Sequence, residues 1–162
     1  MPRATAAANT SADTATDWLA LDRQLCFALY AASLAMTKAY KPLLDPLALT
    51  YPQYLVMLVL WEGDGITVSR LGERLNLDSG TLTPLLKRLQ AQGLVQRLRD
   101  ATDERRVLLH LSAAGRALRD RAQAVPRSIA AAANCDLGEI AALTQRLAGL
   151  RRQLAEFTPR AA

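Results

Sequence analysis

Apolar residues recur along most of this chain with the 3.6-residue period of amphipathic helices. Residues 18–40 place them on one broad stripe, which predicts a helix that buries this stripe. Pro42 then interrupts the pattern, because proline removes a helix hydrogen bond. Residues 51–62 are apolar nearly all round, and Thr50 with Gln53 has the spacing of a capping box. We therefore expect a second helix at the centre of the fold.

The middle of the chain predicts two short helices joined by a tight turn. Thr67 can cap the first of them. The other begins at Asp78 or Ser79 and places its leucines on one face. Gly93 can end it with a left-handed backbone. Pro84 would remove one backbone bond of this helix, so we expect an irregular first turn that absorbs it.

A β-hairpin and further helices follow. Residues 94–99 and 107–111 are rich in Leu and Val and flank the polar segment DATDERR, which predicts a hairpin. Residues 113–132 predict a helix interrupted near Pro126, and a capping box opens a last helix over residues 136–157. The order helix, turn, helix, hairpin is that of a winged helix-turn-helix, whose second helix lies in the DNA major groove.

These elements predict a mainly α fold with a small β-hairpin wing. Residues 1–17 are rich in Ala and Thr and predict a disordered tail, and residues 18–162 predict a single unit. Within that unit, residues 63–112 form the expected DNA-binding region. The helical regions 18–62 and 113–157 carry more Leu and Ala faces than one small module needs. We expect them to build the interface of a homodimer.

Composition limits the class of protein. The 162 residues carry Lys+Arg 20 against Asp+Glu 15, a net charge of +5, which fits nucleic acid as a partner without proving it. The chain lacks an apolar run long enough for a membrane span and an export signal at its start, so we expect a cytoplasmic protein without a membrane partner. Two cysteines and one histidine are too few for a zinc site. We expect no metal and no cofactor.

The start of the second helix of the helix-turn-helix carries small hydroxyl side chains, which allow close approach to base edges and phosphates. The hairpin adds two arginines suited to a flanking minor groove, and Asp103 can form a salt bridge with Arg105. Taken alone, these residues could equally be helix caps and a solvated face. The order of the elements favours double-stranded operator DNA as the partner. The residues expected to contact it are Ser79, Gly80, Thr81, Thr83, Lys87, Arg88, Arg105 and Arg106.

Two stretches resemble a known family. LDSGTLTPLLKRLQAQGLVQR, followed by RDATDERRVLLHLSAAG, is similar to the MarR family of winged-helix regulators, and the likeness extends from about residue 18 to the end. The hairpin signature Asp103-Glu104-Arg105 is intact. Within the family, DSGTLTPLLKRL resembles the organic-hydroperoxide-sensing, OhrR-type branch. The resemblance implies a dimeric MarR-like architecture and a transcriptional repressor.

Cys26 falls in the first predicted helix, where it is either a small buried hydrophobe or a reactive thiol. Tyrosine hydroxyls can hydrogen-bond a thiolate, but Tyr40 lies too far along the same helix to reach Cys26. The OhrR resemblance implies that two tyrosines of the other subunit contact the reactive cysteine, and Tyr40 and Tyr51 match those positions. It also implies an organic hydroperoxide as the inducer that oxidises Cys26 and releases the operator.

Cys135 precedes the last predicted helix and is either a chance thiol or a second redox-active cysteine. The resemblance to two-cysteine members of the branch implies an intersubunit Cys26–Cys135 disulfide.

Other functions stay open. A MarR-type regulator could instead respond to a phenolic or other small molecule bound without covalent chemistry. A thiol peroxidase or oxidoreductase is disfavoured by the missing Cys-x-x-Cys and the lack of a strand-rich thioredoxin pattern, so we expect no enzyme. A helical dimer that does not bind DNA is the remaining alternative.

Overall fold

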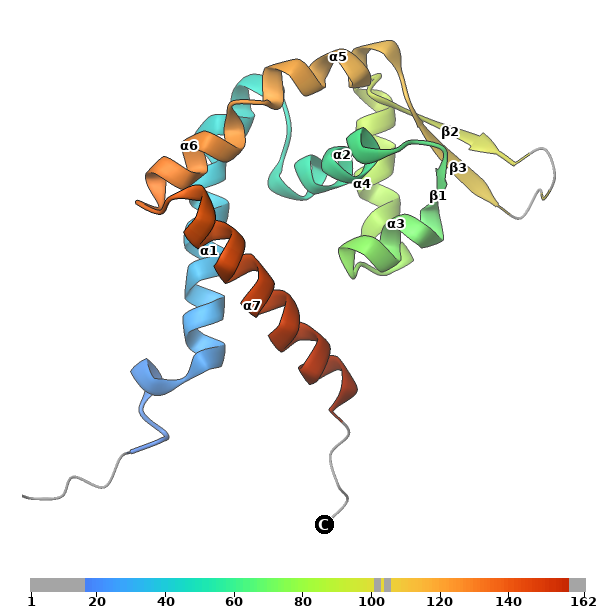
Figure 1. Cartoon of the computed structure of the whole chain (residues 1–162). Helices are drawn as coiled ribbons and strands as arrows, with labels where there is room; N and C mark the ends of the chain where they lie inside the picture. The colour runs from blue at the N-terminus through green and yellow to red at the C-terminus, as the bar shows by residue number, and fades with distance from the viewer. Residues whose placement is uncertain (1–16, 101–102, 104–105, 158–162) are drawn as a thin grey trace, which may run out of the picture. The chain divides into compact units, whose positions relative to one another are not determined.

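The computed structural model describes residues 17–100, 103 and 106–157. The chain divides into two compact units at the Met36–Thr37 bond. The first unit contains a short 3-10 helix, Leu21–Arg23, and the start of α1, Leu25–Leu44. The second contains the end of α1 and all later elements, which Figure 1 labels in chain order.

Helix α1 differs from its prediction at both ends. It begins at Leu25 rather than near residue 18, and it continues through Pro42 to Leu44. Proline removes only one backbone hydrogen bond, and Pro42 lies in the last turn of α1. The helix therefore tolerates it. The apolar stripe that was expected to be buried is exposed in the single chain, where Leu25 is 58% and Met36 is 39% exposed.

Helix α2, Tyr51–Glu62, is the centre of the second unit, and Val56 and Met57 are fully buried in it. The predicted capping box is confirmed, because the Thr50 side chain accepts the Gln53 N–H and the Gln53 side chain accepts the Thr50 N–H. A 3-10 helix, Asp45–Leu47, precedes it. The central position predicted from the all-round apolar sequence is therefore correct.

Helices α3, Val68–Leu75, and α4, Ser79–Ala91, form the predicted helix-turn-helix. Leu71 of α3 and three leucines of α4 (Leu82, Leu86 and Leu89) are buried against α2 in the core. Pro84 lies inside a continuous helix, so the expected irregular first turn is wrong. Gly93 has a φ of 71°, as its predicted role requires.

A small antiparallel sheet carries the hairpin. Strands β2, Val95–Arg99, and β3, Val107–Leu111, pair with Arg97 opposite Leu109, which confirms the predicted wing. A third strand, β1, Ile66–Thr67, pairs with the other edge of β3 and was not predicted. Two residues are too short to show an alternation of apolar and polar side chains.

The predicted interruption near Pro126 is confirmed: α5, Ala113–Ala122, ends before it, and a separate helix, α6, Val125–Ala132, carries Pro126 in its first turn. Helix α7, Leu137–Glu156, opens with the predicted capping box of Asp136 and Glu139. Its leucines face solvent in the single chain: Leu137, Leu143, Leu147 and Leu154 are 48–64% exposed. In the part of the chain that is described, no single helix is long and apolar enough to cross a membrane, although the bent pair Leu25–Leu47 and Tyr51–Glu62 passes that test together.

Candidate nucleic-acid interface and thiol site

The first turn of α4 is fixed by its N-cap, Asp78. One carboxylate oxygen accepts the Thr81 N–H at 2.8 Å, and the other accepts the Thr81 hydroxyl at 3.1 Å. These two bonds, the backbone bond first, lower the pKa of Asp78 below its ordinary value. The carboxylate therefore stays ionised at neutral pH and holds the first turn in one conformation.

The predicted residues at this end of α4 lie at the surface. Ser79, Gly80 and Thr81 are exposed, whereas Thr83 is half-buried and donates its hydroxyl to the Ser79 carbonyl at 2.7 Å. Lys87 is exposed and lies seven residues after Gly80, close to two helical turns, so both occupy the same face. This face points away from the buried leucines and is accessible to a ligand.

Arg88 is also exposed and lies one residue after Lys87, about a quarter of a turn further round the helix. It lines a groove of about 480 Å³ together with Asp45, Gln53 and Gln92. Ser79 lies nine residues earlier, half a turn round the helix. Thr81 lies seven residues before Arg88, close to two helical turns, so Arg88 shares a face with Thr81 but points away from Ser79.

The wing is described only in part. Arg105 lies outside the described residues, so its predicted salt bridge with Asp103 stays a prediction. Arg106 is exposed, donates its backbone N–H to the Asp103 carbonyl at 2.9 Å, and has a guanidinium nitrogen 3.7 Å from the Asp100 carboxylate. These contacts form the turn that leads into β3.

A groove beside the wing brings together residues that sequence reasoning did not group. Thr67, Ser69, Arg97 and Arg106 line a space of about 400 Å³ between the start of α3 and the hairpin. The Nε of Arg97 is buried and has no hydrogen-bond partner within the described ranges. Arg97 was missed as a site residue, because its sequence position in β2 does not reveal which element faces it across the sheet.

The two predicted redox cysteines are both free thiols. Cys26 is exposed at the second position of α1, in the first unit. Cys135 is half-buried in the connection between α6 and α7, and its Sγ donates to the Ala133 carbonyl at 3.3 Å. Among the described residues, no group of three or more His, Cys, Asp or Glu side chains could hold a metal ion.

The two predicted thiol-orienting tyrosines lie together in the second unit. The ring centroids of Tyr40 and Tyr51 are 4.7 Å apart, and Tyr54 lies 5.7 Å from Tyr40. Burial, with a smaller effect of the neighbouring phenols, raises the pKa of Tyr40 to about 12. Burial also raises the pKa of Tyr51, so both predicted tyrosines are neutral hydrogen-bond donors at physiological pH. Cys26 belongs to the other unit, so its contact with these phenols stays a prediction.

A helix-turn-helix that lies between β1 and the β2–β3 hairpin of one three-stranded sheet, with α4 exposed at its start, defines a winged-helix protein of the kind that regulates transcription. The model of the family "Transcriptional regulator SarA/Rot" matches residues 38–121. The chain belongs to this SarA/Rot and MarR type of winged-helix transcriptional regulators.

Three relatives illustrate the match. The chain is 55% identical over 113 residues to the organic hydroperoxide resistance transcriptional regulator of Bacillus subtilis, which covers 70% of this chain and 77% of the relative. It is 48% identical over 153 residues to the regulator TtmR of Methylorubrum extorquens, with 94% and 77% covered.

The third relative is AbfR of Staphylococcus epidermidis. Its reduced, DNA-bound structure is 35% identical with a TM-score of 0.68, and the match covers 85% of this chain and 96% of that one. A disulfide-formed AbfR structure is 37% identical with a TM-score of 0.58, covering 80% and 91%.

Proposed function

We propose that this protein is a DNA-binding repressor that releases its operator when an organic hydroperoxide oxidises Cys26. The observation that carries the proposal is an exposed thiol at the start of α1 in a chain that also holds a close pair of neutral phenols, Tyr40 and Tyr51. An exposed thiol can meet a peroxide, and phenols can donate hydrogen bonds to a thiolate.

The DNA-binding part of the proposal assigns the start of α4 to the major groove. Ser79, Gly80 and Thr81 approach the bases and phosphates, and Lys87 reaches the backbone from the same face. Arg106 in the wing, with Arg97 in the groove beside it, contacts flanking phosphates. The shared groove of Arg97 and Arg106 supports this assignment, because it brings two guanidinium-bearing residues to one surface beside the wing. Arg105, outside the described residues, is assigned to the minor groove.

A homodimer is part of the proposal. The apolar faces of α1 and α7 are exposed in the single chain, where Tyr30 is 62% and Leu154 is 61% exposed. A second copy of the chain would bury them. Such a dimer places two α4 helices at the spacing of successive major grooves, about 34–36 Å. A rearrangement of the dimer then removes DNA affinity, because both helices must fit the duplex together.

The proposed switch is a two-electron oxidation. The Cys26 thiolate attacks one peroxide oxygen, the O–O bond breaks, and the other oxygen leaves with a proton as an alcohol. The product is a sulfenic acid, whose oxygen came from the peroxide. The Cys135 thiol of the other subunit then attacks this sulfur, a disulfide forms, and water leaves. The tyrosine contacts to the thiolate are lost in the first step.

The relatives support this choice of signal. The Bacillus subtilis regulator is named for organic hydroperoxide resistance, and AbfR has been solved both reduced on DNA and with a disulfide. These facts concern those proteins, and here they favour a thiol-based signal over others.

The test is a binding titration with the DNA upstream of the protein's own gene, using reduced protein and then protein treated with cumene hydroperoxide. Cys26→Ser should bind as tightly as wild type and stay bound after treatment. Cys135→Ser should still respond, because the sulfenic acid forms without it, but should give no disulfide on non-reducing electrophoresis. Release of DNA from Cys26→Ser by the peroxide would refute the proposal.

A second candidate function rests on a cavity. An apolar pocket of about 330 Å³ between the end of α1 and the start of α2 is lined by Lys38, Lys41, Leu49 and Tyr51, among others. Lys41 is paired with Asp45 at 2.8 Å, so Lys38 is the cation that suits a small phenolic acid, which would act as a non-covalent inducer. Operator release from Cys26→Ser by a phenolic acid such as salicylate, without peroxide, would support this alternative.

A further inference from the structure

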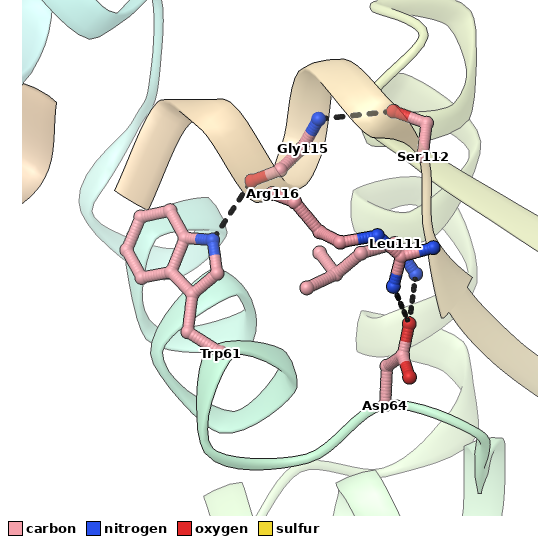
Figure 2. A network of polar contacts seen from close by, with 6 residues as sticks. All are labelled: Trp61, Asp64, Leu111, Ser112, Gly115 and Arg116. Carbon is pink, nitrogen blue, oxygen red and sulfur yellow. Dashed lines mark hydrogen bonds and ion pairs between the residues drawn. The ribbon is translucent and has the colours of Figure 1, made fainter. Parts of the chain in front are cut away.

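Asp64 lies in the short connection between α2 and β1, and its carboxylate contacts two other elements. Its Oδ2 accepts the Leu111 N–H at 2.9 Å, at the end of β3, and lies 2.7 Å from a guanidinium nitrogen of Arg116 on α5. Figure 2 shows both contacts converging on one oxygen. One carboxylate oxygen therefore joins the α2–β1 connection, the end of the wing strand and the first part of α5.

The bond to Leu111 continues the pairing of β1 with β3. The Gly65 N–H donates to the Leu109 carbonyl at 2.7 Å, and Ile66 pairs with Leu109 in the sheet. The next N–H of β3 that points toward β1 belongs to Leu111, and it lies beyond the end of β1. The Asp64 side chain supplies the acceptor that a longer strand would have supplied. Leu111 is 5% exposed, so its N–H depends on this acceptor.

The other edge of the hairpin base is fixed by different contacts. The Ser112 N–H donates to the Leu94 carbonyl at 3.0 Å, and the Ser112 hydroxyl donates to the Gly93 carbonyl at 2.6 Å, just after α4. Trp61 of α2 donates its indole N–H to the Gly115 carbonyl of α5 at 2.8 Å (Figure 2). The start of α5 is thus a fixed support, and Asp64 ties β3 to it through Arg116.

The geometry of a hairpin amplifies motion at its base. Each wing strand has five residues, and a strand rises about 3.4 Å per residue, so the far end lies roughly 17 Å from the base. A rotation of roughly 10° at the base moves a point about 17 Å away by about 3 Å. That is the length of a hydrogen bond, enough to take a cationic side chain out of contact with a phosphate.

We propose that Asp64 is a positioning residue for the wing: its carboxylate fixes the base of the β2–β3 hairpin to the α2–β1 connection and, through Arg116, to α5, and the wing's share of DNA affinity depends on it. Asp64 acts through the hairpin and not by touching DNA. Arg116, which is 62% exposed, adds to the effect but contributes less than the half-buried Leu111 bond. The inference rests on the proposed function, because it explains how that function's DNA contacts are held in place.

The test compares four single variants for affinity to the operator. Asp64→Ala removes both contacts. Asp64→Asn keeps an oxygen that can accept from Leu111 but loses the ion pair, and Arg116→Gln loses only the ion pair. Arg106→Ala weakens the wing itself. We expect a loss of about tenfold for Asp64→Ala and of about twofold to threefold for Asp64→Asn and Arg116→Gln alike.

The decisive variant is the double change Asp64→Ala with Arg106→Ala. If Asp64 acts through the wing, the double variant binds within about twofold of the weaker single variant, since a misplaced wing has no contact left to lose. Hydroxyl-radical footprints of Asp64→Ala should lose the flanking minor-groove protection and keep the central protection. Losses that multiply in the double variant, or uniform loss of the footprint, would overturn the inference, because a general folding defect gives both.

A second measurement decides the inference without DNA. Amide hydrogen exchange of the free protein should become faster in β2 and β3 of Asp64→Ala while α2 and α4 keep their protection. If wild type fails to bind its operator, the proposed function fails. The exchange measurement still decides whether Asp64 holds the wing, because it uses the free protein. Unchanged exchange in β3 would overturn the inference.

Discussion

Gly115 in the first turn of α5 is the position where a single methyl group should do the most harm. A Cβ added there would lie 2.1 Å from the Leu94 carbonyl oxygen, a backbone atom that cannot rotate away. The start of α5 would have to move by more than about 1 Å to restore ordinary contact. That movement would break two hydrogen bonds that cross this junction, from Ser112 N–H to Leu94 and from Trp61 to Gly115.

The size of the effect follows from those bonds. Each contributes about 1 kcal/mol, and displaced packing adds about 1 kcal/mol, while the better helix propensity of alanine offsets up to about 1 kcal/mol. Gly115→Ala should therefore lower the free energy of unfolding by about 2 kcal/mol, measured by urea denaturation followed by circular dichroism. Gly63→Ala is the matched control, because Gly63 has nothing within 4 Å of an added Cβ and an extended backbone. A Gly115→Ala variant within about 0.5 kcal/mol of wild type would refute this reasoning.

Three further predictions use the charged and phenolic groups. Asp78→Ala should weaken operator binding more than Asp78→Asn, because asparagine can still cap α4 through Thr81; equal affinities by fluorescence anisotropy would contradict this. Because burial raises the pKa of Tyr40 from 10.0 to about 12, its neutral form is favoured by folding, and the resulting stability is present below pH 10 and lost as pH rises toward 12. Unfolding measured from pH 9 to 12 should show this loss, and Tyr40→Phe should lose less. The hydrogen bond from the Leu111 N–H, and then Arg116, lower the pKa of Asp64. The stability advantage of wild type over Asp64→Asn should therefore be constant above pH 5 and shrink as pH falls below about 3.8. An advantage that grows with acid would disprove the assignment.

Local sequence signals predicted most of the fold. The capping boxes of α2 and α7 and the N-caps of α3 and α4 depend on residues three positions apart, so the sequence contains the whole interaction. The wing was predictable because its two strands are joined by one polar segment.

Contacts between distant residues were not predictable in the same way. Asp64 and Leu111 are 47 positions apart, and nothing in either neighbourhood marks the other as its partner. The apolar stripe of α1 was located correctly, but the prediction that it is buried was wrong for the single chain. Periodicity shows which face of a helix is apolar and does not show what covers that face. The grouping of Arg97 with Arg106 likewise depends on how β2 and β3 lie against α3.

The candidate site was predicted in parts. The start of α4 and Cys26 are exposed, and Tyr40 lies beside Tyr51, whereas the roles that the resemblance implied for these residues stay predictions. In the proposed dimer, Cys26 of one subunit meets Tyr40 and Tyr51 of the other. Their distance therefore depends on how two subunits assemble.

The central claim is that the oxidation state of Cys26 sets the occupancy of DNA. The most direct measurement titrates the protein–operator complex with cumene hydroperoxide and determines, in the same samples, the fraction of DNA released and the fraction of Cys26 oxidised by mass spectrometry. The account predicts that both fractions rise together over one range of peroxide concentration. DNA that leaves while Cys26 is still a thiol, or DNA that stays bound when Cys26 is fully oxidised, would contradict it.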